Sequence, residues 1–224
     1  MLDMTDTYTG AVVVGGPIDI RELTGLTIAK VQVGTMSNNA YLLRDMASGE
    51  GLLIDAAAEP ARLAELGRLG GDPIRHVFTT HQHRDHWQAL EAVLADTDAQ
   101  TIAGAADADG LPVPVDRKVQ HGDTIALGES TLELIGLRGH TPGSTAVLYR
   151  DPEGVAHLFT GDSLFPGGVG KTWSDEDFVS LIDDVEQRIF GTLPDDTWFY
   201  PGHGDDSTLG AERPHLAEWR ARGY

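Results

Sequence analysis

Six consecutive residues, HQHRDH at positions 81–86, follow directly after the apolar segment IRHVFTT. That segment is typical of a buried strand, so the six residues begin where a strand ends. If the chain stays extended, His81 and His83 point the same way, because side chains alternate along a strand with a period of two. Both imidazoles can then reach one ion, while Asp85 and His86, where a helix begins, can serve a second. The chain must therefore fold so that ligands from other strand ends converge here.

Three further segments place a potential metal ligand beside glycine at the end of an expected strand. They are GHTPGS, TGDS and PGHG, which contribute His140, Asp162 and His203. Glycine lets the backbone turn sharply and approach an ion closely. Each segment alone is more typical of a simple turn, and the first run alone could be a solvated loop. Together they supply five histidines and two aspartates, which suits two four- to five-coordinate ions that share a bridging carboxylate.

Cysteine is absent from the chain. This excludes disulfides, iron–sulfur clusters, thiol nucleophiles and Cys-ligated zinc, so nitrogen and oxygen must hold any metal. The formal net charge of -19 repels phosphate backbones, and we expect no nucleic-acid partner. The sequence contains no long uninterrupted apolar run, so we expect no membrane-spanning helix. The N-terminus, MLDMTDTYTG, has acids where a secretory signal has bases, so we expect a cytoplasmic protein.

The order of apolar runs and turns predicts two β-rich halves, each followed by helices. A chain of 224 residues suits one domain, and we expect a single domain over 1–224 in which 1–24 form an N-terminal arm or an edge strand. Two such halves favour sheets packed face to face with helices outside. The expected elements are a β-meander over 26–54, helices over 59–69, after 86, from Ser174 and over 209–219, strands over 74–80, 99–103 and 197–202, and β-rich segments over 117–161.

The motifs HQHRDH, GHTPGS, TGDS and PGHG together resemble the metallo-β-lactamase fold superfamily, and the match runs from about Leu26 to Trp219. The resemblance implies an α+β fold, a four-layer αββα sandwich with a dinuclear metal site where the two sheets meet. A hydroxide that bridges two divalent ions would be the nucleophile of a hydrolase, with Asp85 and Asp162 to orient it and collect its proton. The resemblance implies a first ion on His81, His83 and His140, a second on Asp85, His86 and His203, and a bridge from Asp162.

Within the superfamily, TTHQHRDH, FTGDSLF and YPGHG are most similar to the glyoxalase II-like hydrolases, which cleave thioesters of small thiols. That resemblance implies a small thioester or ester substrate, with Lys171 binding a carboxylate of the thiol. Trp173 is expected to line the pocket, and packing in the core is the alternative. Zinc is the favoured ion, with iron or manganese as alternatives. The short stretch after Gly204 differs from the helical extension of full-length glyoxalase II, so the thiol stays open. The acyl group and the oligomeric state also stay open.

Other reactions of the same superfamily remain alternatives. A persulfide dioxygenase would hold one iron on a facial triad of His81, His140 and Asp162. Lactonases and β-lactamases share the fold, and the missing cysteine excludes only the β-lactamase type with a Cys ligand. Asp55, at the end of GLLID, is expected to hydrogen-bond a ligand histidine. The remaining histidines are expected to pack or face solvent, namely His76, His121, His157 and His215.

Overall fold

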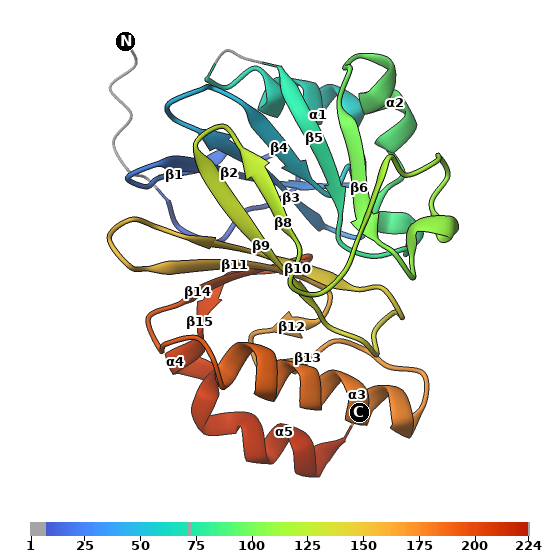
Figure 1. The fold of residues 1–224 in the computed structure, drawn as a ribbon, viewed down its shortest axis with the longest axis vertical. Coiled ribbons are helices and arrows are strands. Elements are labelled where there is room, and N and C mark those ends of the chain that lie inside the picture. The colour runs from blue at the N-terminus through green and yellow to red at the C-terminus, as the bar shows by residue number, and fades with distance from the viewer. Residues whose placement is uncertain (1–7, 71–72, 224) are drawn as a thin grey trace.

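The computed structural model describes residues 8–70 and 73–223, and most of its strands lie in two sheets that face each other (Figure 1). In spatial order the first sheet contains β1 (Asp19–Glu22), β2 (Leu26–Val33), β3 (Asn38–Asp45), β4 (Gly51–Ile54), β5 (Ile74–Thr79), β6 (Gln100–Gly104) and β7 (Arg117–Val119). The second contains β15 (Ser207–Thr208), β14 (Trp198–Pro201), β11 (Ala156–Gly161), β10 (Thr145–Arg150), β9 (Ser130–Gly136) and β8 (Thr124–Leu127). Strands β12 (Leu164–Phe165) and β13 (Gly168–Val169) form a separate small hairpin.

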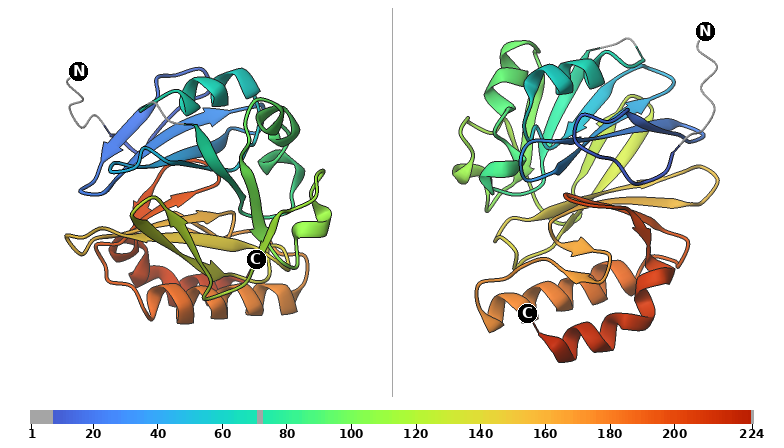
Figure 2. Two further views of the ribbon diagram at one scale, coloured as in Figure 1. Left: turned by 45° about the horizontal axis from the view of Figure 1, so that its top comes forward. Right: turned by 180° about the vertical axis from the view of Figure 1, so that it is seen from behind.

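Helices cover the outer face of each sheet, as both views in Figure 2 show. The helices α1 (Pro60–Gly67) and α2 (Leu90–Ala95) lie on the first sheet. On the second sheet lie α3 (Asp175–Val185), which a π-helical stretch, Glu186–Phe190, extends, α4 (Leu209–Glu212) and α5 (Leu216–Arg222). Short 3-10 turns occupy Arg84–His86, Ala108–Gly110 and Arg213–His215. This is the four-layer αββα sandwich that the sequence predicts.

Strand β3 illustrates how the sequence produces two buried faces. Its side chains are buried along the whole strand, and successive residues point to opposite faces. Tyr41 and Leu43 pack between the sheets, against residues such as Phe159 of β11. Ala40 and Leu42 pack on the other side, in the cluster that includes α1 and α2. A strand with helices on one face and a sheet on the other therefore has a continuous apolar run at its centre, here AYLL over 40–43.

The ends of the helices on the second sheet differ in how well the sequence predicts them. Ser174 caps α3 as expected, since its side chain accepts a hydrogen bond from the backbone N–H of Asp177 at 3.1 Å. The prediction of one helix over 209–219 is wrong. Pro214 has no backbone N–H to continue the α-helical ladder, so a 3-10 turn separates α4 from α5.

The predicted N-terminal arm is only partly within the described residues, because 1–7 lie outside them. Strand β1 is the edge of the first sheet and pairs antiparallel with β2. Ahead of β1 the chain crosses to the second sheet, where Gly10 accepts a hydrogen bond from the backbone N–H of Asp206 at 3.2 Å. Across 8–70 and 73–223, no helix is both long and apolar enough to span a membrane. The single domain stays a prediction.

Candidate metal centre

The seven predicted ligand side chains lie together at one edge of the sandwich, where loops of both sheets meet. The HQHRDH run follows β5 of the first sheet. Backbone hydrogen bonds join the loops, among them Thr145 N–H to the Thr80 carbonyl at 3.0 Å and Gly202 N–H to the Gly161 carbonyl at 2.8 Å. The second sheet supplies His140 between β9 and β10, Asp162 after β11 and His203 after β14.

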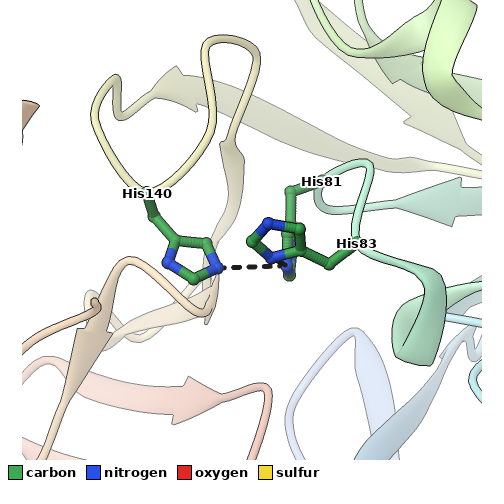
Figure 3. A group of neighbouring side chains, drawn as sticks. All are labelled: His81, His83 and His140. Carbon is green, nitrogen blue, oxygen red and sulfur yellow. Dashed lines mark hydrogen bonds between the residues drawn. The ribbon is translucent and has the colours of Figure 1, made fainter. Parts of the chain in front are cut away.

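The first group consists of three imidazoles, His81, His83 and His140 (Figure 3). The Nε2 atom of His81 lies 3.0 Å from Nδ1 of His83 and 3.3 Å from Nε2 of His140. His81 and His83 project from the same loop, as the alternation of side chains predicts, and His140 approaches from the opposite sheet. Three ring nitrogens thus point at a common centre.

The second group combines Asp85, His86 and His203. Asp85 Oδ2 lies 3.4 Å from Nε2 of His86 and 3.3 Å from Nε2 of His203. Asp162 lies between the groups: Oδ1 is 3.4 Å from His86 Nε2, and Oδ2 is 3.5 Å from His203 Nε2 and 3.8 Å from His140 Nε2. One carboxylate therefore reaches histidines of both groups.

Four of the five histidines use their outer nitrogen, Nδ1, to bond away from the centre. The partners are the Thr80 hydroxyl for His81 at 3.0 Å, the Asp55 carboxylate for His86 at 2.7 Å, the Lys171 carbonyl for His140 at 2.7 Å and the Met36 carbonyl for His203 at 3.0 Å. Carbonyl and carboxylate oxygens only accept hydrogen bonds, and the Thr80 hydroxyl already donates to Asp55. Each Nδ1 therefore carries a hydrogen, so in the neutral ring the lone pair lies on Nε2 and faces inward.

This donor chemistry fits metal ions. Inward lone pairs at such short separations repel one another unless a cation lies between them, and Asp162 Oδ1 is buried without a hydrogen-bond partner in the described chain. A divalent ion would satisfy both the inward ring nitrogens and the Asp162 oxygen. This set of nitrogen and carboxylate ligands suits zinc, iron or manganese. The residues present thus fit two ions, and the assignment of each side chain as a ligand stays a prediction.

The ionisation of the two groups differs. Burial lowers the pKa of His81 and of His140, with His86 and His83 adding positive-charge repulsion. Burial also opposes charge on His86, but the carboxylates of Asp55 and Asp162 outweigh it and raise its pKa to about 10. The pKa of Asp85 is held below its usual range, because hydrogen bonding to His203 and the charge of His86 outweigh burial. Neighbouring carboxylates therefore decide the direction of the pKa shift at His86, whereas burial decides it at His81 and His140.

Backbone features bring Asp162 to its place. The pairing of β11 with β14 shifts register between Phe159 and Gly161, an irregularity that re-aims the side chains beyond it. Gly202 then lies against the carboxylate: a Cβ at this position would come within 2.2 Å of Asp162 Oδ1 and 2.7 Å of His86 Cε1. Glycine is required there by close approach, as the PGHG motif suggests.

A model of the Metallo-beta-lactamase superfamily matches residues 33–206. The chain belongs to the metallo-beta-lactamase superfamily. Both the predicted family and its fold are thereby confirmed. Curated hydroxyacylglutathione hydrolases match this superfamily member at 32–38% identity, and it spans 62–66% of their length. The one from Fuscovulum blasticum is 36% identical over 169 residues, 74% of this chain and 62% of the relative.

Two solved structures superpose well on this chain. The BLEG-1 B3 metallo-beta-lactamase, 24% identical, gives a TM-score of 0.76 and covers 86% of this chain and 99% of that one. At this identity the likeness shows the fold alone. TTHA1623, solved in a di-iron-bound form, is 30% identical with a TM-score of 0.66, covering 82% of this chain and 96% of that one. Chains of similar length therefore adopt this superfamily fold.

Lys171 and Trp173, predicted to bind substrate, lie at the rim of the first group. The Lys171 carbonyl holds His140, while its Nζ lies 4.5 Å from the centre of the Trp173 ring. Trp173 is 66% exposed, and its ring centre is 6.5 Å from that of His83. The Trp173 ring therefore lies beside the first group in this superfamily member with the Lys171 ammonium against it, and their substrate roles stay predictions.

Sequence reasoning missed Asn38, the first residue of β3. Its Nδ2 donates to Asp85 Oδ2 at 2.8 Å and lies 3.3–3.4 Å from Nε2 of His203 and of His86. The available signal was a pair of amides, Asn38-Asn39, at the start of an apolar strand. Asp55 does hydrogen-bond a histidine of the centre, as expected. In the described chain, none of the four other histidines joins a metal-binding group.

Proposed function

We propose that this protein is a metal-dependent hydrolase that cleaves thioesters of small thiols. The observation that carries the proposal is the inward convergence of five imidazoles and two carboxylates at one sheet edge, each of four histidines being held from outside through Nδ1. The similarity to hydroxyacylglutathione hydrolases supports thioesters as the substrate class.

In this proposal the first ion lies among His81, His83 and His140, and the second among Asp85, His86 and His203, with Asp162 between them. When bound, two divalent ions supply a water of lowered pKa as nucleophile and an electrophile for the substrate carbonyl. This is why no serine or lysine nucleophile is needed. The net reaction adds one water to the thioester and yields a carboxylic acid and a thiol.

The two aspartates have the proton-handling roles. Burial alone would raise the pKa of Asp162, but the imidazoles of His203 and His86, whose Nε2 atoms lie 3.5 and 3.4 Å from the carboxylate, hold it well below the usual range, so the carboxylate stays ionised. The same holds for Asp85, which Asn38 also fixes through a 2.8 Å hydrogen bond. Ionised carboxylates at these positions orient the attacking water and accept its proton.

A thioester suits a centre with no obvious general acid. A free thiol has a pKa of about 8.5, so a thiolate departs near neutral pH without prior protonation. Lys171 and Trp173 at the rim would receive the thiol part, the ammonium attracting a carboxylate and the ring covering apolar atoms.

Zinc is the ion proposed, because tetrahedral nitrogen and carboxylate sites are typical of it. Iron and manganese are the alternatives, and the di-iron-bound form of TTHA1623 favours iron of the two. A cytoplasmic location stays a prediction from the sequence.

The test is metal analysis combined with assays on protein purified without added metal. S-lactoyl thioesters, followed by thiol release, and persulfides, followed by oxygen uptake, are the two substrate classes. Two metal equivalents per chain with thioester turnover are the expected result. One iron per chain with oxygen uptake would overturn the proposal in favour of a persulfide dioxygenase.

A further inference from the structure

A carboxylate outside the metal centre joins the loops that carry the first group. Asp107 follows β6 and is fully buried. Its Oδ2 accepts hydrogen bonds from the backbone N–H of Gln82 at 3.0 Å and from the hydroxyl of Thr141 at 2.5 Å. Its Oδ1 accepts the backbone N–H of Gly143 at 2.7 Å. Three donors from two separate loops therefore meet on one side chain.

The donors stand next to the histidines of the first group. Gln82 lies between His81 and His83, and Thr141 follows His140. Asp107 touches none of these rings, yet it fixes the backbone on both sides of the gap that separates them. A shift of either loop would change the separation of the nitrogens that now lie 3.0–3.3 Å apart.

The packing around Asp107 leaves the loops little freedom. A Cβ at Gly143 would come within 2.5 Å of the Asp107 backbone nitrogen and 2.8 Å of its Cβ and Cγ. A Cβ at Gly104 would come within 2.0 Å of the Gly143 carbonyl oxygen. These contacts set the loop between β9 and β10 directly against the segment that carries Asp107.

We propose that Asp107 is a positioning residue for the first metal ion, acting through the backbone of the loops that hold His81, His83 and His140. The inference rests on the proposed metal centre and adds a residue that touches neither ion nor substrate. Outer residues that orient metal ligands typically change metal affinity by about 10- to 100-fold when substituted.

The decisive variant is Asp107→Asn, which keeps the size of the side chain. An amide has one acceptor oxygen and one NH2 group, so at least one backbone N–H would face another donor. The matched control is Asp45→Asn. Asp45 is also buried and accepts hydrogen bonds from two loops, through the backbone and hydroxyl of Ser48 and of Ser130, but at the opposite end of β3.

Metal-free wild type and both variants are titrated with Zn²⁺ against a competing chromophoric chelator, and their unfolding by urea is measured without metal. We expect both variants to lose stability. Only in Asp107→Asn should one of the two zinc affinities fall, by about 10- to 100-fold. Its thioester turnover should fall at limiting zinc and recover at saturating zinc. Zinc affinity within twofold of wild type, or an equal loss in Asp45→Asn, would overturn the proposal.

Thr141→Val is the second variant, used if Asp107→Asn does not fold. It removes one of the three donors at nearly constant volume, and we expect a smaller loss of zinc affinity in the same direction. Unchanged affinity in this variant would also overturn the role of Asp107. Wild type that binds zinc without hydrolysing thioesters removes the proposed function alone, whereas wild type that binds no zinc removes both.

Discussion

At each end of the sandwich a buried aspartate joins the two sheets, but with a different consequence at each end. At the metal end, Asp107 joins a loop of the first sheet to Thr141 and Gly143 of the second. At the far end, Asp45 of β3 in the first sheet accepts hydrogen bonds from the backbone N–H and hydroxyl of Ser130 in the second. Both carboxylates are buried, and both accept backbone and hydroxyl donors. The bond pattern alone therefore does not mark a functional residue; the side chains on the joined loops do.

Backbone geometry separates the two ends more clearly. Near the metal centre Asp55 has a φ of 59°, a left-handed conformation that is uncommon for a residue with a Cβ. Its carboxylate accepts the backbone N–H and hydroxyl of Thr80 and bonds His86. At the far end, the left-handed position of the turn after Asp45 is taken by Gly49. The unfavourable left-handed conformation of Asp55 therefore occurs where its carboxylate orients His86.

The largest effect is expected from Asp162→Ala, which removes the carboxylate between the two groups. Turnover should fall by about a thousandfold, the upper range for loss of one electrostatic stabiliser in an active site. Metal content, measured on the same sample, should fall with it. Retained turnover would show that Asp162 does not bridge, and would leave the metal end with one group rather than two.

Removing metal from wild type should have the next largest effect. An ion that binds only the folded state contributes about 2.7 kcal/mol when its free concentration is a hundred times its dissociation constant. Chelation should therefore lower the urea midpoint of wild type and leave that of metal-free Asp162→Ala nearly unchanged. Hydrogen exchange should speed up at the amides of Gln82 and Gly143, but not at those of Ser48 and Ser130. Equal change at both ends would contradict the comparison.

Asp45→Asn tests the far end by pH. Burial would raise the pKa of Asp45, but the hydrogen bonds from Ser48 and Ser130 prevail and lower it. The ionised carboxylate therefore stabilises the fold above its ordinary pKa, and that contribution is lost as the pH falls through the lowered value. We expect a loss of about 1–3 kcal/mol at pH 7, which shrinks below about pH 4. A loss that is constant with pH would contradict this.

Lys171→Ala should have the smallest effect, because its ammonium group is exposed. The Michaelis constant for an anionic thioester should rise about two- to fivefold, as expected for a surface ion pair. A thioester of an uncharged thiol is the control and should be unaffected. If the substitution changes the Michaelis constant equally for both substrates, Lys171 has no role in substrate binding.

How far the sequence predicts the molecule depends on whether a signal is local. The layers follow from apolar runs such as β3, and the seven candidate ligands follow from residue type and place at strand ends. The roles of Asn38, Asp107 and Asp45 could not be found this way, because each depends on a partner distant in the sequence, namely Asp85, Thr141 and Ser130, at 47, 34 and 85 positions. The apolar pattern over 209–219 predicted one helix, although Pro214, which lacks a backbone N–H, stands within it.

The centre draws its side chains from both sheets, with His81, His83, Asp85 and His86 on one and His140, Asp162 and His203 on the other. Neither group is complete until the sheets have docked, since His140 and His203 each arrive from the second sheet. Ions can then tighten only a late stage of folding. Metal should accordingly slow unfolding far more than it speeds refolding, so that loaded protein gains lifetime without folding faster.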